Sequence, residues 1–267
     1  MRKTSTKLSS LASKTSARFG LGFTASYTFS KSLDDTSNPG VGGAIQTGNV
    51  QLASPQDPWN PGADKGPSTF DVPHNLTFSF IQALPFDRAE LLRSLGNRLT
   101  SGWQVLNISA LSSGLPFTVY SGIQQTGLGS NGVDRPDQVG TPVLSTSRTI
   151  REDYFGQGTE NTSFFDIPIN VPGGTGPNHG RLGTLGRDTF RGPPLHNFDV
   201  ALIKDTTVGH RAGTEAITLQ FRAEFFNVFN LVNFGLPSNV VRGTGFGVIS
   251  KTAANSRQLQ FSLKLLY

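Results

Sequence analysis

The stretch AITLQFRAEFFNVFN, residues 216–230, places apolar side chains at every second position from Ile217 to Phe225. The positions between them are polar and include Arg222 and Glu224. Successive side chains of a β-strand point to opposite faces, so this alternation predicts a strand with one apolar and one polar face. We therefore expect the two charged side chains to lie on the polar face.

Five other stretches show the same alternation and extend the prediction to six strands. They span residues 18–30, 74–84, 102–113, 196–205 and 257–267. The third is less regular, and its pattern puts Leu106, Ile108 and Ala110 on the apolar face. Residues 8–14 form at most a partial seventh strand. Helical spacing of apolar residues occurs only over residues 88–99.

The connections between these strands differ strongly in length. Residues 31–73, 113–195 and 230–257 are long, whereas 84–102 is shorter and 205–214 is short. Outer-membrane barrels alternate short periplasmic turns with long extracellular loops. A compact soluble domain rarely carries several loops longer than about 12–15 residues. The pattern favours an all-β fold, an antiparallel transmembrane β-barrel portion with long extracellular loops.

Two alternatives remain open at this point. A soluble secreted β-sandwich that binds a glycan or a protein has strands with the same alternation. A small self-sufficient outer-membrane pore or adhesin needs additional strands, for which residues 117–121 and 246–251 are the candidates.

Composition narrows the classes of protein. The 267 residues include 31 Gly and 20 Phe but no Cys, and charged residues make up 15%. The absence of Cys excludes disulfides, thiolate metal sites and a thiol nucleophile. No apolar run is long enough for a transmembrane helix. The net charge of +5 without a basic block does not indicate nucleic acid as a partner.

The first residues lack the apolar core of a secretory signal peptide. Either the chain is cytoplasmic or Met1 is not the true start. Natural single-chain barrels have at least about 8 strands, and an open sheet edge cannot lie in lipid with unpaired backbone groups. We therefore expect residues 17–267 to be the C-terminal part of a larger barrel, preceded by a poorly defined segment over residues 1–16.

Several segments resemble, in order, the C-terminal barrel of Oar-like TonB-dependent receptors of the acidobacterial type. The most specific are FRAEFFNVFNLVNFG (residues 221–235) and LGRDTFRGP (residues 185–193), supported by FTASYTFSKSLDD and DRPDQVG. The resemblance implies an outer-membrane transporter with a barrel of about 22 strands, of which this chain supplies about 6–8. It also implies an N-terminal plug and a TonB-contacting segment, neither of which is in these residues.

The residues show no catalytic motif, and we expect no enzyme activity, no cofactor and no metal. Expected partners are outer-membrane lipid, the barrel-assembly machinery, an unknown transported ligand and, through the missing N-terminal parts, the TonB complex. Arg222 and Glu224 are expected to face the lumen. The last strand is expected to carry the C-terminal assembly signal, formed by Leu259, Phe261, Leu263, Leu265 and Tyr267.

Other candidate sites have plain structural explanations. The four histidines are scattered without metal-ligand spacing, and GLGSNG at residues 127–132 lacks the strand and helix of a dinucleotide site. Loop aspartates are typical of turns, with a calcium or substrate contact as the alternative. Four aromatic residues near strand ends fit interfacial girdles. The residues concerned are His74, His179, His196 and His210; Asp34, Asp35, Asp134 and Asp137; and Tyr27, Trp103, Tyr120 and Tyr267.

Overall fold

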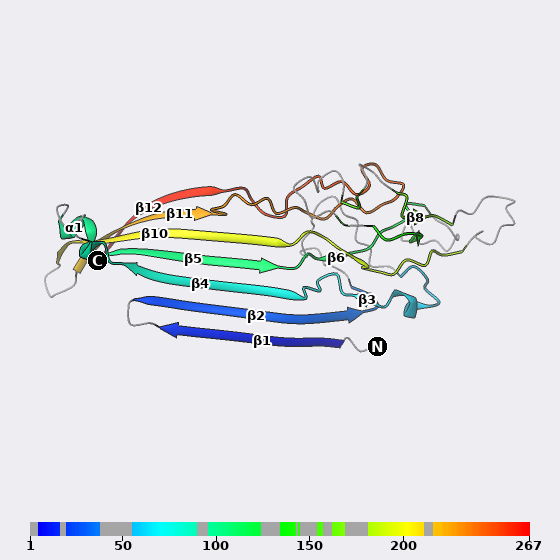
Figure 1. Ribbon diagram of the computed structural model, residues 1–267, viewed down its shortest axis with the longest axis horizontal. Coiled ribbons are helices and arrows are strands. Elements are labelled where there is room, and N and C mark those ends of the chain that lie inside the picture. The colour runs from blue at the N-terminus through cyan, green and yellow to red at the C-terminus, as the bar shows by residue number, and fades with distance from the viewer. Residues whose placement is uncertain are drawn as a thin grey trace.

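One antiparallel sheet runs through the computed structural model, with strand order β1-β2-β4-β5-β10-β11-β12 (Figure 1). The strands are β1 (Ser5–Ser16), β2 (Leu21–Asp34), β4 (His74–Leu84), β5 (Trp103–Ser112), β10 (Leu195–His210), β11 (Ala216–Phe226) and β12 (Gln258–Leu266), and β3 (Gly66–Pro67) pairs with β2. The structure describes residues 5–16, 20–37, 55–89, 96–123, 134–142, 144, 154–156, 162–168, 181–210 and 216–267.

The strands end at two rims. At one rim β2 leads into the 31–73 connection and β5 leads into the 113–195 connection, and the loops gather there in Figure 1. The C-terminus lies at the opposite end, near the start of β5. Because outer-membrane barrels carry their long loops outside the cell, we call the first end the outer rim and the second the inner rim.

The six predicted strands are present, with some differences in extent. β10 continues to His210, so the short connection begins later than expected. β1 covers 12 residues and pairs with β2 from Ser5 opposite Leu33 to Ser16 opposite Gly22. It is therefore longer than the partial strand expected over residues 8–14.

Of the helix expected over residues 88–99, only residues 97–99 are α-helical among those that the structure describes. A 3-10 turn covers Phe86–Arg88, Ala89 is extended, and the only α-helix among the described residues is α1, Asn97–Thr100. Gly96 has φ of 77°, a left-handed conformation that a right-handed helix cannot contain. Residues 90–95 lie outside the described residues.

The register of the strands gives the sheet two chemically different faces. Residues opposite each other on antiparallel strands point to the same side, so Phe221 shares a face with Leu263 and Arg222 with Ser262. We call these the Phe face and the polar face. Aromatic rings meet on the first, with Phe221 and Phe261 at 6.4 Å between centroids. The second carries charged side chains at Asp199, Asp205, Arg222, Glu224 and Lys264.

Strand β5 departs from the sequence-based prediction. Leu106 pairs with Ala201 and Ile81, which places Leu106, Ile108 and Ala110 on the polar face. The prediction that they form the apolar face is therefore wrong. Trp103, Val105 and Leu111 lie on the Phe face instead, together with two polar residues, Asn107 and Ser109.

The two polar residues on the Phe face are hydrogen-bonded to each other, and both are buried. Ser109 Oγ donates to Asn107 Oδ1 at 2.9 Å, and Asn107 Nδ2 donates to the carbonyl of Asp199 at 3.1 Å. Ser109 lies between Phe78 and Phe198, whose rings are 6.4 Å apart, and it is 0% exposed. Hydropathy alone assigned β5 wrongly because it counts these internally bonded groups as polar surface.

The direction of the outermost strands limits how the sheet can close. β1 and β12 both run from the outer rim to the inner rim, and they lie at opposite edges of the sheet. Pairing them would make a parallel contact, whereas outer-membrane barrels are antiparallel. The seven long strands therefore cannot close antiparallel on themselves, and neither can a ring of identical copies in one orientation.

The extra strands proposed for a self-sufficient barrel are not membrane strands. Residues 117–121 contribute only the end of the two-residue β6 (Pro116–Phe117), which pairs with β9 (Phe190–Arg191), and residues 246–251 form no strand. Phe117 is 0% and Phe246 1% exposed, so these apolar residues fill the core of the loops. The prediction of additional strands there is wrong.

A soluble sandwich requires the apolar stripes to be packed against a second sheet. On β12 the stripe is open, with Phe261 64% and Leu263 65% exposed. Apart from this sheet, the described part of the chain contains only two-stranded sheets, β6–β9 and β7–β8 (Asp137–Gln138 with Phe165–Asp166). The buried hydrophobic cluster lies in the loops rather than on the Phe face.

We predict that neighbouring positions of β5 differ in their access to lipid. The chain has no cysteine, so a nitroxide can be attached at Val105→Cys or Leu106→Cys in the complete protein reconstituted in lipid. Oxygen partitions into acyl chains, so its collision rate measured by electron paramagnetic resonance should be clearly higher at position 105 than at 106. A higher collision rate at position 106 would mean that Leu106, Ile108 and Ala110 form the apolar face of β5, as the sequence pattern predicts.

Candidate functional site

The long connections fold together at the outer rim into one packed unit, which we call the loop body. Phe155 is central to its core: its ring stacks on Phe246 at 4.9 Å with an interplanar angle of 5° and meets the edges of Phe165 and Phe190. The 113–195 and 230–257 connections therefore share one hydrophobic core. Its members are Phe117, Val119, Tyr154, Phe155, Phe165, Leu185, Phe190, Leu236, Val241, Phe246 and Ile249.

Ion pairs fasten the 113–195 connection to the segment that precedes β4. Arg135 contacts Asp64 at 2.5 Å, Arg187 pairs with Asp34 at the end of β2, and Arg191 pairs with Asp71. The carboxylates are at most 11% exposed. Removing one partner of such a pair leaves an uncompensated buried charge, which costs about 3–5 kcal/mol. These contacts therefore hold the loops in a fixed arrangement.

Arg187 uses the whole guanidinium fork. Its Nε donates to the carbonyl of Asp64 at 2.8 Å, Nη1 donates to Ser37 Oγ at 2.8 Å and to Asp188 at 3.0 Å, and Nη2 donates to Asp34. The planar guanidinium offers five N–H donors in a rigid geometry that a lysine cannot reproduce. Arg187 is thus the point at which β2, the 31–73 connection and the loop body meet.

The loop aspartates bind arginines and backbone groups rather than forming only local turns. Asp137 accepts hydrogen bonds from Arg181 and from the backbone N–H and hydroxyl of Thr184 at 2.8 and 3.0 Å. The Arg181 hydrogen bond is the main reason that the pKa of Asp137 is lowered. Asp34 pairs with Arg187, and Asp134 is fully buried. Within the described ranges no group of three His, Asp or Glu residues could hold a metal ion.

Three asparagines spaced three residues apart shape the exit from β11. Asn227 and Asn230 have φ of 49° and 52°, which asparagine adopts more readily than most residues. Asn227 Oδ1 accepts from Leu231 N–H at 2.8 Å. Asn233 brackets the backbone of His196, accepting from its N–H at 2.7 Å and donating to its carbonyl at 2.9 Å. Periodicity did not single out these asparagines, although their regular spacing is a visible signal in the sequence.

The charged residues predicted for the lumen lie together on the polar face. Arg222 Nη2 donates to Glu224 Oε1 at 2.8 Å, and both are about one quarter exposed. On the same face Gln220 Nε2 donates to Asp205 at 2.9 Å. Their orientation toward a lumen stays a prediction, because it depends on closure of the barrel. The role of the C-terminal residues as an assembly signal also stays a prediction; these residues lie on the Phe face of β12 or just beyond its end.

The other candidate residues occupy different places. Trp103 begins β5 at the inner rim, where its Nε1 donates to the carbonyl of Leu99 at 2.7 Å. Tyr120 is 5% exposed inside the loop body, so its predicted girdle position is wrong. His74 and His196 lie at the outer rim, and His210 ends β10 at the inner rim. His179 and residues 127–132 lie outside the described residues.

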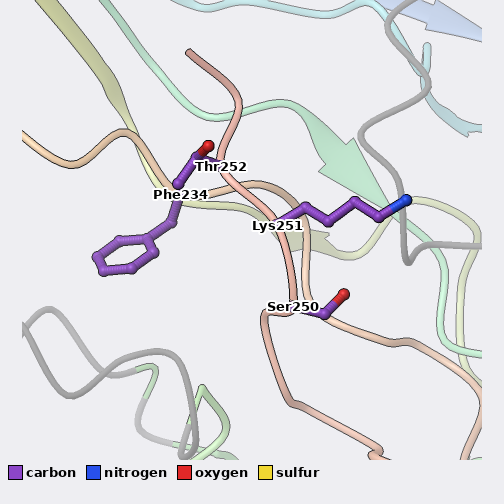
Figure 2. Close-up of a pocket in the computed structure, with 4 residues that line it drawn as sticks. All are labelled: Phe234, Ser250, Lys251 and Thr252. Atoms are coloured by element: carbon purple, nitrogen blue, oxygen red, sulfur yellow. The ribbon is translucent and has the colours of Figure 1, made fainter. Parts of the chain in front are cut away.

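A cavity of about 430 Å³ lies beside the loop that connects β11 to β12. It is lined by Phe234, Ser250, Lys251 and Thr252. Figure 2 shows the Phe234 ring and the Lys251 side chain pointing in opposite directions from the two paired segments.

The two-faced sheet and the long loops at one rim agree with the comparison to protein families. A family model described as an outer membrane beta barrel domain matches residues 3–260. The chain belongs to this family. It is therefore located in the outer membrane. Barrels of this kind turn their apolar face toward lipid, which is the orientation we expect for the Phe face. No curated protein and no solved structure matches the chain. No helix among the described residues could span a membrane.

We predict that Arg187→Ala destabilises the loop body by about 3–5 kcal/mol, because it leaves buried Asp34 and Asp188 without their cation. The measurement is the urea dependence of loop proteolysis in the outer-membrane protein. Arg181→Ala is the matched control, because the Arg181 side chain is 35% exposed and Asp137 keeps its bonds to Thr184. Equal sensitivity of the two variants would contradict the anchoring role of Arg187.

Asp188 should make the loop body more stable at mildly acidic pH. Burial raises the pKa of Asp188 to about 6, above the ordinary value of 3.8. The folded protein therefore binds this proton more tightly than the unfolded chain, and the resulting stability is full below pH 3.8 and is lost as pH rises through about 6, an effect of up to about 3 kcal/mol. Between pH 5 and 7.5, the melting temperature of the wild type should fall more than that of Asp188→Asn. If the melting temperatures of the wild type and of Asp188→Asn change equally with pH, the raised pKa of Asp188 is contradicted.

Proposed function

We propose that the chain is the C-terminal barrel part of a TonB-dependent, Oar-like receptor, and that its loop body captures the transported ligand. In such a receptor, energy relayed through TonB loosens a plug and lets a scarce ligand pass the lumen. This chain would supply lumen wall, extracellular binding surface and the C-terminal strand, whereas plug and TonB contact would come from other segments.

The main support is the strand count of the sheet. Seven long antiparallel strands, with both edge strands running in the same direction, require an odd number of further strands for antiparallel closure. A barrel of about 22 strands fits this requirement, because the strands still needed would be odd in number. A different observation disfavours the small self-sufficient pore or adhesin: the candidates for its additional strands, residues 117–121 and 246–251, form no membrane strand. The open Phe face disfavours the soluble sandwich.

The loop body has the properties of a fixed recognition surface. Its core and ion pairs hold its backbone, so a ligand would meet an ordered surface and little ordering entropy would be lost on binding. Trp59 is 86% exposed there, and its backbone N–H is bonded to Asp57 Oδ1 at 2.9 Å. An exposed indole offers a flat apolar surface for stacking.

The proposal predicts that the complete protein binds TonB. After extraction from the outer membrane in mild detergent, it should be retained on the immobilised periplasmic domain of TonB, whereas a porin from the same extract should flow through. Flow-through of the complete, assembled protein would overturn the transport proposal and leave its membership of the barrel family intact.

A further inference from the structure

A second feature of the molecule lies on the lipid side of the outer rim, away from both lumen and loop surface. A pocket of about 260 Å³ has Tyr27, His74, Leu76, Leu111 and His196 in its lining. Register places Tyr27, Leu76, Leu111 and His196 in one row across four strands of the Phe face. The pocket therefore opens toward the outer leaflet of the membrane.

One histidine of the pocket is oriented by its neighbours. Tyr27 Oη and His74 Nδ1 are hydrogen-bonded at 2.8 Å, and the His74 ring lies 5.3 Å from that of Phe29. When the Tyr27 hydroxyl donates to Nδ1, the proton of the neutral imidazole is on Nε2. His74 then presents an N–H donor, which suits an oxygen-rich acceptor such as a phosphate.

The second histidine is held through its backbone. Asn233 bonds both the N–H and the carbonyl of His196, so the loop that follows β11 fixes the position of this residue. Leu111 lies on β5, the strand between those of the two histidines, and pairs with Leu76, which follows His74 by two residues on β4. The pocket thus combines an apolar floor with imidazoles from two sides.

The surroundings match the two ends of an anionic lipid. Toward the outside, Lys31 lies two residues beyond Phe29 on the same face and is exposed, which adds positive charge. Toward the membrane centre, the face continues with Phe78 and Phe198, whose rings are in contact. Acyl chains can therefore cover the aromatic stripe while a headgroup occupies the pocket.

We propose that this pocket, which we call the rim pocket, binds the phosphate-bearing headgroup of an outer-leaflet lipid. His74 and His196 donate hydrogen bonds to the phosphate oxygens, and Tyr27 sets the orientation of His74. The proposal is independent of what the barrel transports, because it depends only on the lipid-facing position of the Phe face.

Native mass spectrometry of the complete protein, delipidated in detergent, tests this assignment. The probes are dihexanoyl phosphatidylglycerol, the uncharged diacylglycerol with the same chains, and inorganic phosphate. We expect retention of the phospholipid alone, with at least about tenfold weaker binding in the double variant His74→Gln/His196→Gln. His210→Gln, at the opposite rim, is the matched control and should bind as the wild type does.

Each other outcome contradicts the proposal. Equal binding of diacylglycerol would mean that the Phe face alone holds lipid, and equal binding of inorganic phosphate would make the site an anion site without a lipid. Unchanged binding in the double variant would remove the histidines from the site. Tyr27→Phe retains the aromatic ring but loses the hydroxyl, so it should weaken phospholipid binding less than the double variant does. A loss equal to that of the double variant would contradict its purely orienting role.

Discussion

The structure depends first on the absence of water inside the membrane. Every backbone N–H and C=O in the hydrocarbon region needs a protein partner, and the ladder from β1 to β12 supplies these partners for all strands inside the sheet. Only the two edges are left without a neighbour in this sheet. Because both edge strands point in the same direction, an antiparallel barrel needs an odd number of further strands between them.

The Phe face shows how the sheet forms a smooth apolar surface from residues of unequal size. A small residue between two large ones allows the rings of neighbouring strands to meet above it, as Phe78 and Phe198 do over Ser109. Beneath these rings, the Ser109 hydroxyl donates a hydrogen bond to the Asn107 side chain. A strand that carries polar residues can thus face lipid when its neighbours are large enough to enclose them.

Sequence periodicity predicted the strands because alternation is a direct property of an extended backbone. It failed at β5, where the phase of the alternation depends on large residues of the neighbouring strands, such as Phe198. It also failed for residues 117–121 and 246–251, because a short apolar run is equally suited to a strand and to a loop core. The pairs Arg187–Asp34 and Arg191–Asp71 join residues 153 and 120 positions apart, a distance at which no local pattern carries information. By contrast, the charged pair Arg222 and Glu224 was recognisable because both residues share one strand face.

The long sequence separation of these ion pairs bears on the order of assembly. If the long connections lie outside the cell, as in outer-membrane barrels generally, Asp34 and Asp71 reach it with one connection and Arg187 and Arg191 with another. The charges can neutralise each other only after both connections have crossed the bilayer. Once they have done so, drawing either segment back would expose a bare carboxylate or guanidinium to the acyl region. The pairs can therefore form only when both connections lie on the same side of the membrane.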